Sequence, residues 1–376
     1  MKFLGARVTN YKCIEDSGWV WFDDVTCLVG KNESGKTAFL QALQRLSPVP
    51  GGPDTFDLHD YPRKRLSRYR QMHERRPANA VSAAFELFPH EMRLIEEVYG
   101  PGILRSPRVT VRKNYKNEAT WDFDIDPPSV ILAERIIQDF LVELLPAFVY
   151  FDDYALLPGT ISTPEFSQRV TEGRQRGSDR TLQALLRLAR IDLPAPEHDL
   201  DYETLKADLE AASATITGEV LRYWSQNRQL RVQFDLSGSD LHVRIWNDRH
   251  QISVPFDERS RGFVWFFSFL AYFSQLDAER ADYVFLLDEP GLNLHAQAQK
   301  DFLRFIDERL APLHPVIYTT HSPFLINPAR LERVRTVEDV DGRGTVISSD
   351  LRGRSDDTLA PVEVAVGYER LRTVLA

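Results

Sequence analysis

A short run of residues near the amino terminus, Gly30–Thr37, has the types and spacing of a phosphate-binding loop. It reads Gly-Lys-Asn-Glu-Ser-Gly-Lys-Thr and fits the pattern G-x-x-x-x-G-K-[ST] at each fixed position. In such a loop, main-chain N–H groups at a helix start surround the β-phosphate, the lysine neutralises charge on the β- and γ-phosphates, and the hydroxyl binds Mg²⁺. The residues expected to bind ATP here, with Thr37 also holding Mg²⁺, are Gly30, Lys31, Asn32, Glu33, Ser34, Gly35, Lys36, Thr37 and Ala38.

Two adjacent acids, Asp288 and Glu289, follow the apolar run Tyr283–Leu287 far downstream. Such a run predicts a buried strand, and open α/β sheets bind their ligands at the carboxyl ends of parallel strands. Hydrolysis needs two acids, because a carboxylate that holds a metal ion is a poor base. We therefore expect Asp288 to hold Mg²⁺, directly or through water. Glu289 is expected to accept a proton from the attacking water, or to polarise it.

The elements that must position these residues are indicated by the hydrophobic pattern. A nearly all-apolar strand, Val25–Val29, is expected before the loop and a helix, Lys36–Leu46, after it. Other expected strands are Phe3–Ile14, Ala80–Phe88, Val109–Lys113, Thr120–Ile125, Ala147–Phe151 and Val316–Thr320, with a hairpin from Leu230–Leu236 and Leu241–Trp246. Expected helices are Val130–Leu144, Gly262–Phe273, His295–Ile306 and a helical region from Pro164 to Gln229.

Two downstream segments resemble those of ABC ATPases. Leu286–His295, Leu-Leu-Asp-Glu-Pro-Gly-Leu-Asn-Leu-His, is similar to their Walker B and D-loop segment. Tyr318–Phe324, Tyr-Thr-Thr-His-Ser-Pro-Phe, is similar to their switch-histidine segment. The histidine of that family contacts the γ-phosphate, so the resemblance implies this role for His321. The catalytic residues expected in this chain are then Lys36, Glu289 and His321.

ABC ATPases also use a signature loop that reaches the nucleotide of a partner subunit, and two segments compete for this role. Leu236–Ser239 is closer in its letters, but Ser-Gly between two alternating strands is ordinary hairpin chemistry. Glu258–Gly262 instead opens a helix shortly before Asp288, and this position favours it. Ser260, Arg261 and Gly262 are therefore expected to bind the partner's γ-phosphate, where a helix N-terminus favours an anion. The alternative is an ordinary capped helix.

The finer resemblance is to the ATPase part of overcoming-lysogenization-defect (OLD) proteins, an ATP-dependent nuclease family linked to phage defence. It covers nearly the whole chain and includes the phosphate-binding loop, the Ser-Arg-Gly signature, Asp60–Arg63, Phe148–Tyr154 and His321–Phe324. Members commonly continue into a Toprim nuclease domain. The residues up to Ala376 resemble the stretch just before that domain, and the resemblance does not include the Asp-x-Asp metal cluster of a Toprim. We therefore expect no nuclease active site here, and a Toprim nuclease in cis or in trans as a partner.

These features predict an α/β protein, an ABC/SMC-type P-loop ATPase with a mixed sheet core and a helical insertion. Residues 1–157 are expected to form a first lobe with the P-loop, and 158–230 a helical insertion that is a candidate dimerisation arm. Residues 231–376 are expected to form a second lobe with the signature, Walker B and the switch histidine. A signature that acts across subunits implies a homodimer or a higher homo-oligomer.

Composition and charge limit the other functions. The longest apolar run, Phe263–Phe273, is shorter than the roughly 20 residues of a membrane span, so no membrane partner is expected. Met1–Arg7 lacks a secretory pattern, and two cysteines, Cys13 and Cys27, suit a reducing cytoplasm. The net charge of −9 argues against a protein coated in basic residues.

Three local clusters are nevertheless basic. The densest, Arg63–Arg76, carries seven cations against one acid, Glu74, and is a hypothetical DNA-binding stripe. Its alternatives are a solvated face, a mobile loop or a site that docks a protein. The other clusters are Arg105, Arg108, Arg112, Lys113 and Lys116, and Arg169, Arg174, Arg176 and Arg180.

Three functions stay open at this point. The first is an ATPase that dimerises around ATP and regulates nucleic-acid engagement or an associated Toprim nuclease, in phage defence or DNA metabolism. The second is a slow-turnover, nucleotide-gated protein-interaction switch. Only the rate of ATP turnover, measured with and without DNA, distinguishes it from the first. The third is the motor subunit of a membrane transporter, which the large insertion between Pro158 and Asp240 disfavours.

Overall fold

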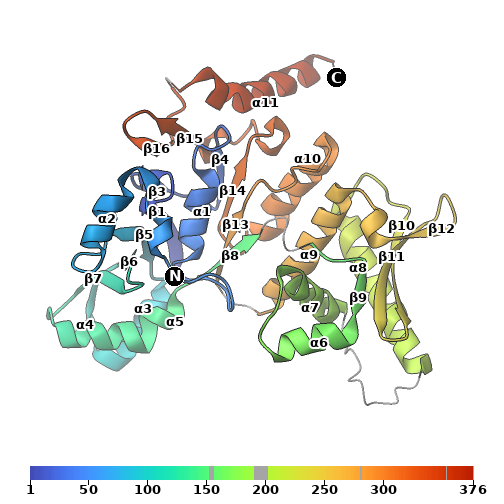
Figure 1. Ribbon diagram of the computed structural model, residues 1–376, viewed down its shortest axis with the longest axis horizontal. Helices are drawn as coiled ribbons and strands as arrows, with labels where there is room; N and C mark the ends of the chain where they lie inside the picture. Colours follow the sequence, from blue (N-terminus) through green and yellow to red (C-terminus); the bar gives the residue numbers. More distant parts are fainter. Residues whose placement is uncertain (152–155, 190–201, 280–281, 353, 376) are drawn as a thin grey trace. The chain divides into compact units, whose positions relative to one another are not determined.

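The computed structural model describes residues 1–151, 156–189, 202–279, 282–352 and 354–375. The chain divides into two compact units, each built from separate stretches (Figure 1). Unit 1 comprises Met1–Tyr150, Asp282–Pro290 and Asp307–Ala376, and unit 2 comprises Phe151–Ala281 and Gly291–Ile306. The sequence analysis divided the chain into three consecutive segments, 1–157, 158–230 and 231–376. The two units are instead built from stretches that are separate in the sequence, so the three-segment division stays a prediction.

The central sheet of unit 1 has the strand order β16-β15-β4-β14-β13-β8. Strands β4, β13, β14 and β15 are parallel where they pair, and β16 is antiparallel to β15. Every residue of β4, β13 and β14 is buried, which explains their apolar sequences. The strands are β4 Val25–Val29, β8 Ala147–Phe151, β13 Tyr283–Leu287, β14 Val316–Thr320, β15 Val334–Val340 and β16 Gly344–Ser348.

A second, antiparallel sheet of unit 1 has the order β2-β1-β5-β6-β7, with β3 also paired to β1. Helix α1, Lys36–Gln44, contacts β1 and β5 of this sheet and β13 of the central one, so the core lies around its buried face. The phosphate-binding loop thus leads into a helix that is packed on both sheets. The strands are β1 Lys2–Tyr11, β2 Ile14–Asp16, β3 Val20–Trp21, β5 Asn79–Glu86, β6 Leu104–Asn114 and β7 Ala119–Ile125.

The other helices of unit 1 flank these sheets. The basic stretch 63–76 forms a 3-10 turn, η2 (Arg63–Arg65), and helix α2 (Leu66–His73), where the sequence analysis assigned no element. Helix α11, Asp356–Leu375, contacts β15. The remaining helical elements are η1 Leu58–Asp60, α3 Pro89–Tyr99, α4 Val130–Ile136, η3 Ile137–Leu141, α5 Val142–Leu144, η6 Ile306–Leu310, η7 Pro323–Leu325 and η8 Leu331–Arg333.

Unit 2 combines helices with a small antiparallel sheet of order β10-β11-β12, in which β9 also pairs with β11. The predicted hairpin is confirmed: β10 and β11 pair from Leu230↔Asn247 to Ser237↔Asp240, and Gly238 turns the chain with φ 61°. Helix α8 packs on β10, and α7 packs on α9. The elements are β9 Thr160–Ser162, α6 Thr163–Thr171, α7 Gly177–Ala189, α8 Tyr202–Tyr223, β10 Leu230–Ser237, β11 Asp240–Asn247, β12 Ile252–Pro255, η5 Phe256–Glu258, α9 Arg261–Glu279 and α10 Ala296–Phe305.

The predicted fold class is confirmed. A mixed central sheet carries the P-loop between β4 and α1, and helices predominate in the large inserted part of unit 2. This agrees with the α/β architecture expected for an ABC/SMC-type P-loop ATPase. The insertion also contains strands, so it is not helical throughout. Within the described ranges, no helix has the length and apolar character needed to cross a membrane.

Candidate nucleotide site

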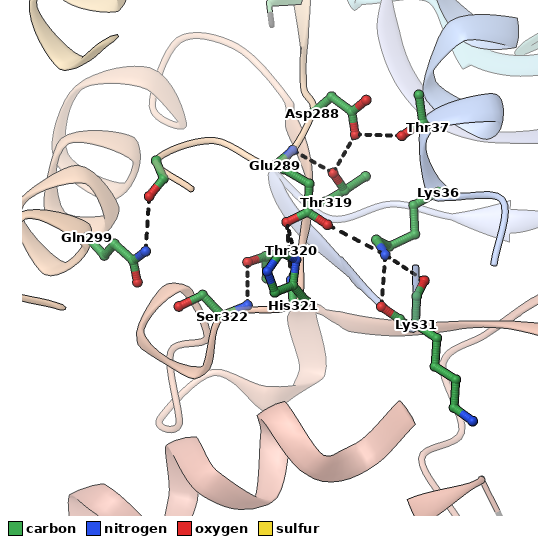
Figure 2. Close-up of polar contacts among 12 residues, drawn as sticks. Lys31, Lys36, Thr37, Asp288, Glu289, Gln299, Thr319, Thr320, His321 and Ser322 are labelled. Atoms are coloured by element: carbon green, nitrogen blue, oxygen red, sulfur yellow. Dashed lines mark hydrogen bonds and ion pairs between the residues drawn. The ribbon is translucent and has the colours of Figure 1, made fainter. Parts of the chain in front are cut away.

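The loop between β4 and α1 is wrapped around the side chain of Lys36 (Figure 2). The Lys36 ammonium donates hydrogen bonds to the carbonyl oxygens of Gly30 and Lys31, both at 2.8 Å, and the residue is only 6% exposed. Gly35 has φ 103°, and a Cβ at Gly30 would lie 2.1 Å from the carbonyl oxygen of Val337. Both glycines are therefore required by the path of the chain.

The loop presents donors that suit a phosphate group. The Ser34 hydroxyl is buried, and within the described part of the chain it has no hydrogen-bond partner. Gly35 is the N-cap of helix α1 and provides no side-chain hydrogen bond, so the first N–H groups of the helix point out of its start. An anion at this place would satisfy both features, which fits the β-phosphate of a nucleotide. The structure thus brings together Gly30, Lys31, Ser34, Gly35 and Lys36 as the sequence predicted, with Asn32 and Glu33 in the same loop and Thr37 and Ala38 in the first turn of α1.

Asp288 is anchored by hydroxyl groups from three elements. Its Oδ1 accepts hydrogen bonds from Thr37 in α1, at 3.1 Å, and from Thr319 in β14, at 2.7 Å. Its Oδ2 accepts one from Tyr150 in β8, at 2.8 Å. Thr37 and Asp288 therefore offer neighbouring oxygen atoms, the ligand type that Mg²⁺ prefers. Sequence reasoning missed Tyr150 and Thr319; the available signal was a polar side chain at the carboxyl end of each strand beside β13.

Glu289 lies between Lys36 and His321. Its Oε1 is 3.5 Å from the Lys36 ammonium, and its Oε2 is 2.9 Å from Nδ1 of His321 (Figure 2). The main-chain N–H of His321 also donates to Oε2, at 3.3 Å, and the N–H of Glu289 donates to Thr319 Oγ1, at 2.7 Å. Glu289 has φ 46°, a backbone conformation that is rare outside glycine and that clusters at functional sites. The candidate base is thus held by a cation and a histidine.

The signature residues begin helix α9 in unit 2. The Ser260 hydroxyl accepts a hydrogen bond from the N–H of Phe263, at 3.3 Å, as in an ordinary helix cap. A Cβ at Gly262 would lie 2.6 Å from the carbonyl oxygen of Asn293, so this glycine lets α9 approach the D-loop. Arg261 is exposed, and Nε of Arg259 is buried with no hydrogen-bond partner within the described residues. Packing explains Gly262 without a phosphate, and the role in trans stays a prediction.

A cavity of 490 Å³ borders the phosphate-binding loop within unit 1. Its walls are loop residues 31–34, the β15 residues 337–340, and Ser355 and Thr358. Burial would raise the pKa of Glu338 in this wall, but hydrogen bonds from the N–H and hydroxyl of Ser355 outweigh it and leave the pKa below its ordinary value. The wall therefore carries a carboxylate, and the loop is open to solvent beside it.

The three basic clusters differ in how their charges are paired. In 63–76 all seven cations are exposed, and Arg65 pairs with Glu15 at 3.0 Å. In the second cluster Arg105 pairs with Asp126 and Arg112 with Asp122, while the Lys113 ammonium donates to main-chain carbonyl oxygens. In the third, Arg169 pairs with Asp179 and Arg174 with Glu172. The first cluster therefore presents the most cationic charge to solvent.

Comparison with known proteins links both parts of the site to ATPases. A family model described as "AAA ATPase domain" matches residues 1–56, which contain the phosphate-binding loop. Another, described as "AAA domain, putative AbiEii toxin, Type IV TA system", matches residues 222–327, which contain Asp288, Glu289 and His321. The chain carries AAA-ATPase-like sequence. The finer OLD identity is not tested by these matches, and Asp152, Asp153 and Tyr154 of its motif lie outside the described residues.

The chain is also similar to a curated protein over part of its length and to solved structures over most of its length. Over 157 residues the chain is 27% identical to "Uncharacterized protein MJECL43" of Methanocaldococcus jannaschii, and the match spans 40% of the chain and 40% of that relative. The SMC head domain from Thermotoga maritima is 14% identical, with 92% of this chain and 98% of that chain covered and a TM-score of 0.43.

Two further SMC heads cover 92% of this chain at 13% identity. One was solved bound to the C-winged helix domain of ScpA, with 98% of that chain covered and a TM-score of 0.49. The other, derived from Pyrococcus furiosus with an extended coiled coil and bound to the C-terminal domain of ScpA, has 95% covered and a TM-score of 0.46.

Proposed function

We propose that this protein binds Mg-ATP, dimerises around it and hydrolyses it, and that this cycle regulates nucleic-acid engagement or an associated Toprim nuclease in phage defence or DNA metabolism. One observation carries the proposal. Lys36, Thr37, Asp288, Glu289 and His321 are joined by hydrogen bonds and ion pairs within a single unit, at the carboxyl edge of the central sheet. That edge is where parallel sheets bind ligands.

Each residue of this set has a separate task. The loop N–H groups, the Ser34 hydroxyl and Lys36 bind the β- and γ-phosphates. Thr37 and Asp288 hold Mg²⁺, which supplies neutralisation of phosphate charge when bound. Tyr150 and Thr319 orient the Asp288 carboxylate through the hydrogen bonds they donate to it.

Glu289 is the proposed general base, and ATP itself is expected to release it. In the structure its carboxylate is 3.5 Å from the Lys36 ammonium. The γ-phosphate competes for that ammonium, because a phosphate carries more negative charge than a carboxylate. Once Lys36 turns to the nucleotide, Glu289 is free to accept a proton from water, and His321 is free to contact the γ-phosphate.

The dimer of this proposal uses unit 2. Ser260, Arg261 and Gly262 lie at the start of the long helix α9, and a helix N-terminus favours an anion. Presented by a partner subunit, they complete the γ-phosphate site. The proposal therefore includes a homodimer or higher homo-oligomer, DNA contacts through Arg63–Arg76, a Toprim nuclease in cis or in trans, and a cytoplasmic location.

The test combines turnover with oligomeric state. Steady-state phosphate release and light scattering are measured on the same samples, with Mg-ATP, with ATP and EDTA, and without nucleotide. We expect turnover only with Mg²⁺ and a doubled mass with Mg-ATP in the Glu289→Gln variant. Mg-dependent turnover by a protein that stays monomeric would contradict the dimer, and no turnover under any condition would contradict the hydrolase.

A second candidate is a nucleotide-gated interaction switch with slow turnover. The observation in its favour is that Glu289 is held from both sides, by Lys36 and His321, so the base is restrained in this structure. The two candidates separate in a turnover assay with and without DNA. A strong stimulation by DNA favours the coupled ATPase. Tight ATP binding with slow, DNA-independent turnover favours the switch.

A further inference from the structure

Unit 1 contains a second cavity, of 570 Å³, that shares no residue with the candidate nucleotide site. Its walls come from β1, β2, β5, β6 and helix α2, together with the turn that carries Trp19. Two separate stacks of aromatic rings end at these walls. Their construction shows what kind of molecule the cavity suits.

The first stack consists of two exposed indoles. Trp19 and Trp21 lie 5.5 Å apart between ring centroids, with an interplanar angle of 12°, and are 37% and 51% exposed. Trp21 lies across β1 at Gly5, where a Cβ would be 2.6 Å from its Cε3 atom. A glycine inside a strand leaves room for this ring. Trp19, the other member, lines the cavity.

The second stack consists of three tyrosines. Tyr115 and Tyr61 lie 3.6 Å apart at 13°, and Tyr61 and Tyr69 lie 4.5 Å apart at 15°. Tyr61 and Tyr69 line the cavity, and Tyr69 donates a hydrogen bond of 2.6 Å to Oδ1 of Asn10. Tyr115 donates one of 2.5 Å to the carbonyl oxygen of Asn10. The aromatic walls are therefore fixed before any ligand binds.

The cavity itself is close to electrically balanced, while its rim is cationic. Arg7 pairs with Asp16, both in the wall, and the wall residue Arg112 pairs with Asp122. Such a space suits an uncharged ring better than a phosphate. Arg76 is itself a wall residue, and Arg65 pairs with the wall residue Glu15 at 3.0 Å. Arg68, Arg70 and Arg75 are exposed on or beside α2, the helix whose Tyr69 and Met72 line the cavity.

We propose that this cavity binds an unpaired base of a single-stranded nucleic acid, stacked on Trp19, with the flanking phosphates on the cations on and beside α2. The proposal deepens the nucleic-acid engagement proposed above and rests on it. Aromatic rings stack with any base, whereas a base inside a duplex is already stacked and paired. A strand is favoured over a free nucleotide because the cations continue along α2 beyond the cavity.

The experiment measures fluorescence anisotropy of a labelled oligo(dT) strand with the full chain, without ATP. A duplex of equal length and free dTMP serve as competitors. We expect the strand to bind more tightly than the duplex and dTMP to compete only weakly. Trp19→Ala should weaken strand binding at least about fivefold, since one stacked base contributes roughly 1–3 kcal/mol, while Trp19→Phe should retain most of it.

Phe88→Ala is the matched control, because Phe88 is also 37% exposed and lies outside the cavity. Arg76→Gln is a second test that leaves both stacks in place. Unchanged strand affinity in Trp19→Ala and Arg76→Gln would overturn the proposal. Equal competition by dTMP or by duplex would overturn the assignment to a single strand. ATP turnover is assayed separately, so strand binding without turnover would contradict the hydrolase and not this inference.

Discussion

The candidate nucleotide site and the signature segment are organised in opposite ways. In the first, Lys36, Asp288, Glu289 and His321 of unit 1 already contact one another or a shared neighbour within a single chain. The second lies in unit 2 as a capped helix start, with Ser260 bonded to its own helix. Residues proposed to act within one subunit therefore show their arrangement in a single chain, whereas the residues proposed to act on a partner show only their local packing.

The largest expected effect tests the unit 1 side of this comparison. Lys36→Ala removes the ammonium that neutralises the phosphates and should lower ATP affinity by about 100-fold, measured by calorimetry, since a charge-assisted hydrogen bond contributes about 1.5–3 kcal/mol. Lys2→Ala is the control, because Lys2 is exposed in β1. Equal ATP affinity in wild type and Lys36→Ala would show that the loop does not bind the phosphates.

The second prediction tests whether unit 2 acts on a partner. Ser260→Ala and Lys36→Ala subunits should each be inactive alone, because both composite sites of a homodimer lack one part. Mixed together, they should recover at most one working site per heterodimer. The measurement is phosphate release across a mixing series, with light scattering on the same samples. A linear average of the two parental activities would rule out action in trans.

The third prediction contrasts the basic charges of the two units. Replacing Arg65, Arg68 and Arg70 together with glutamate should remove DNA binding and any DNA stimulation of turnover but spare basal ATP hydrolysis. The slope of log affinity against log salt should fall by about 0.9 for each lost contact with duplex DNA. The charge-matched control is a second triple variant, in which glutamate replaces three exposed cations of unit 2, Arg174, Arg228 and Arg249. If both triple variants behave alike, net charge and not the stripe governs binding.

The fourth prediction concerns Thr319, which joins the two acids. Its buried hydroxyl donates to Asp288 and accepts from the N–H of Glu289. Thr319→Val should therefore lower the Mg-dependent gain in ATP affinity about tenfold, the size expected from outer partners of a metal site. Binding measured with EDTA should change little. Thr319→Ser keeps the hydroxyl and should restore the gain; a failure of this rescue would assign Thr319 to packing alone.

The prediction with the smallest expected effect concerns the folding stability of unit 2. Asp179 is 3% exposed and accepts from Arg169 and from the N–H of Arg176. Burial raises its pKa, but these hydrogen bonds lower it below the ordinary value. The charge therefore stabilises the fold above pH about 4 and loses this effect as the pH falls through the folded-state pKa.

Asp179→Asn should cost about 1 kcal/mol at pH 7, measured by urea unfolding, because a charged hydrogen bond is replaced by a neutral one. The difference from wild type should shrink in acid. A difference that is independent of pH would show that the charge of Asp179 contributes nothing.

The sequence could predict the local parts of this account. Gly30–Thr37 and the apolar strands Val25–Val29 and Tyr283–Leu287 are contiguous patterns, and each specifies its own structure. The donors to Asp288 are different, since Tyr150 and Thr319 lie 138 and 31 positions away in the chain. A tyrosine or threonine in a strand is an ordinary strand residue until the fold brings it to the acid.

Helix α2 and the aromatic cavity escaped prediction for related reasons. The basic stretch Arg63–Arg76 has little apolar periodicity, so charge alone characterised it. Tyr61 follows η1, Tyr69 lies in α2 and Tyr115 follows β6, so their stacking arises only when the chain folds. Trp19 and Tyr69 lie far apart in the sequence, and only the fold brings both to the wall of one cavity.

The central claim is that unit 1 holds the phosphate-binding, Mg²⁺-binding and general-base residues of an ATP hydrolysis site, with Glu289 as the base. The most direct measurement compares bound nucleotide with released phosphate in Glu289→Gln after a single addition of radiolabelled Mg-ATP. The account predicts wild-type ATP affinity, retention of intact ATP on the protein, and hydrolysis slower by about 10²–10⁴-fold, the usual contribution of a general base. Hydrolysis at the wild-type rate by Glu289→Gln would contradict it.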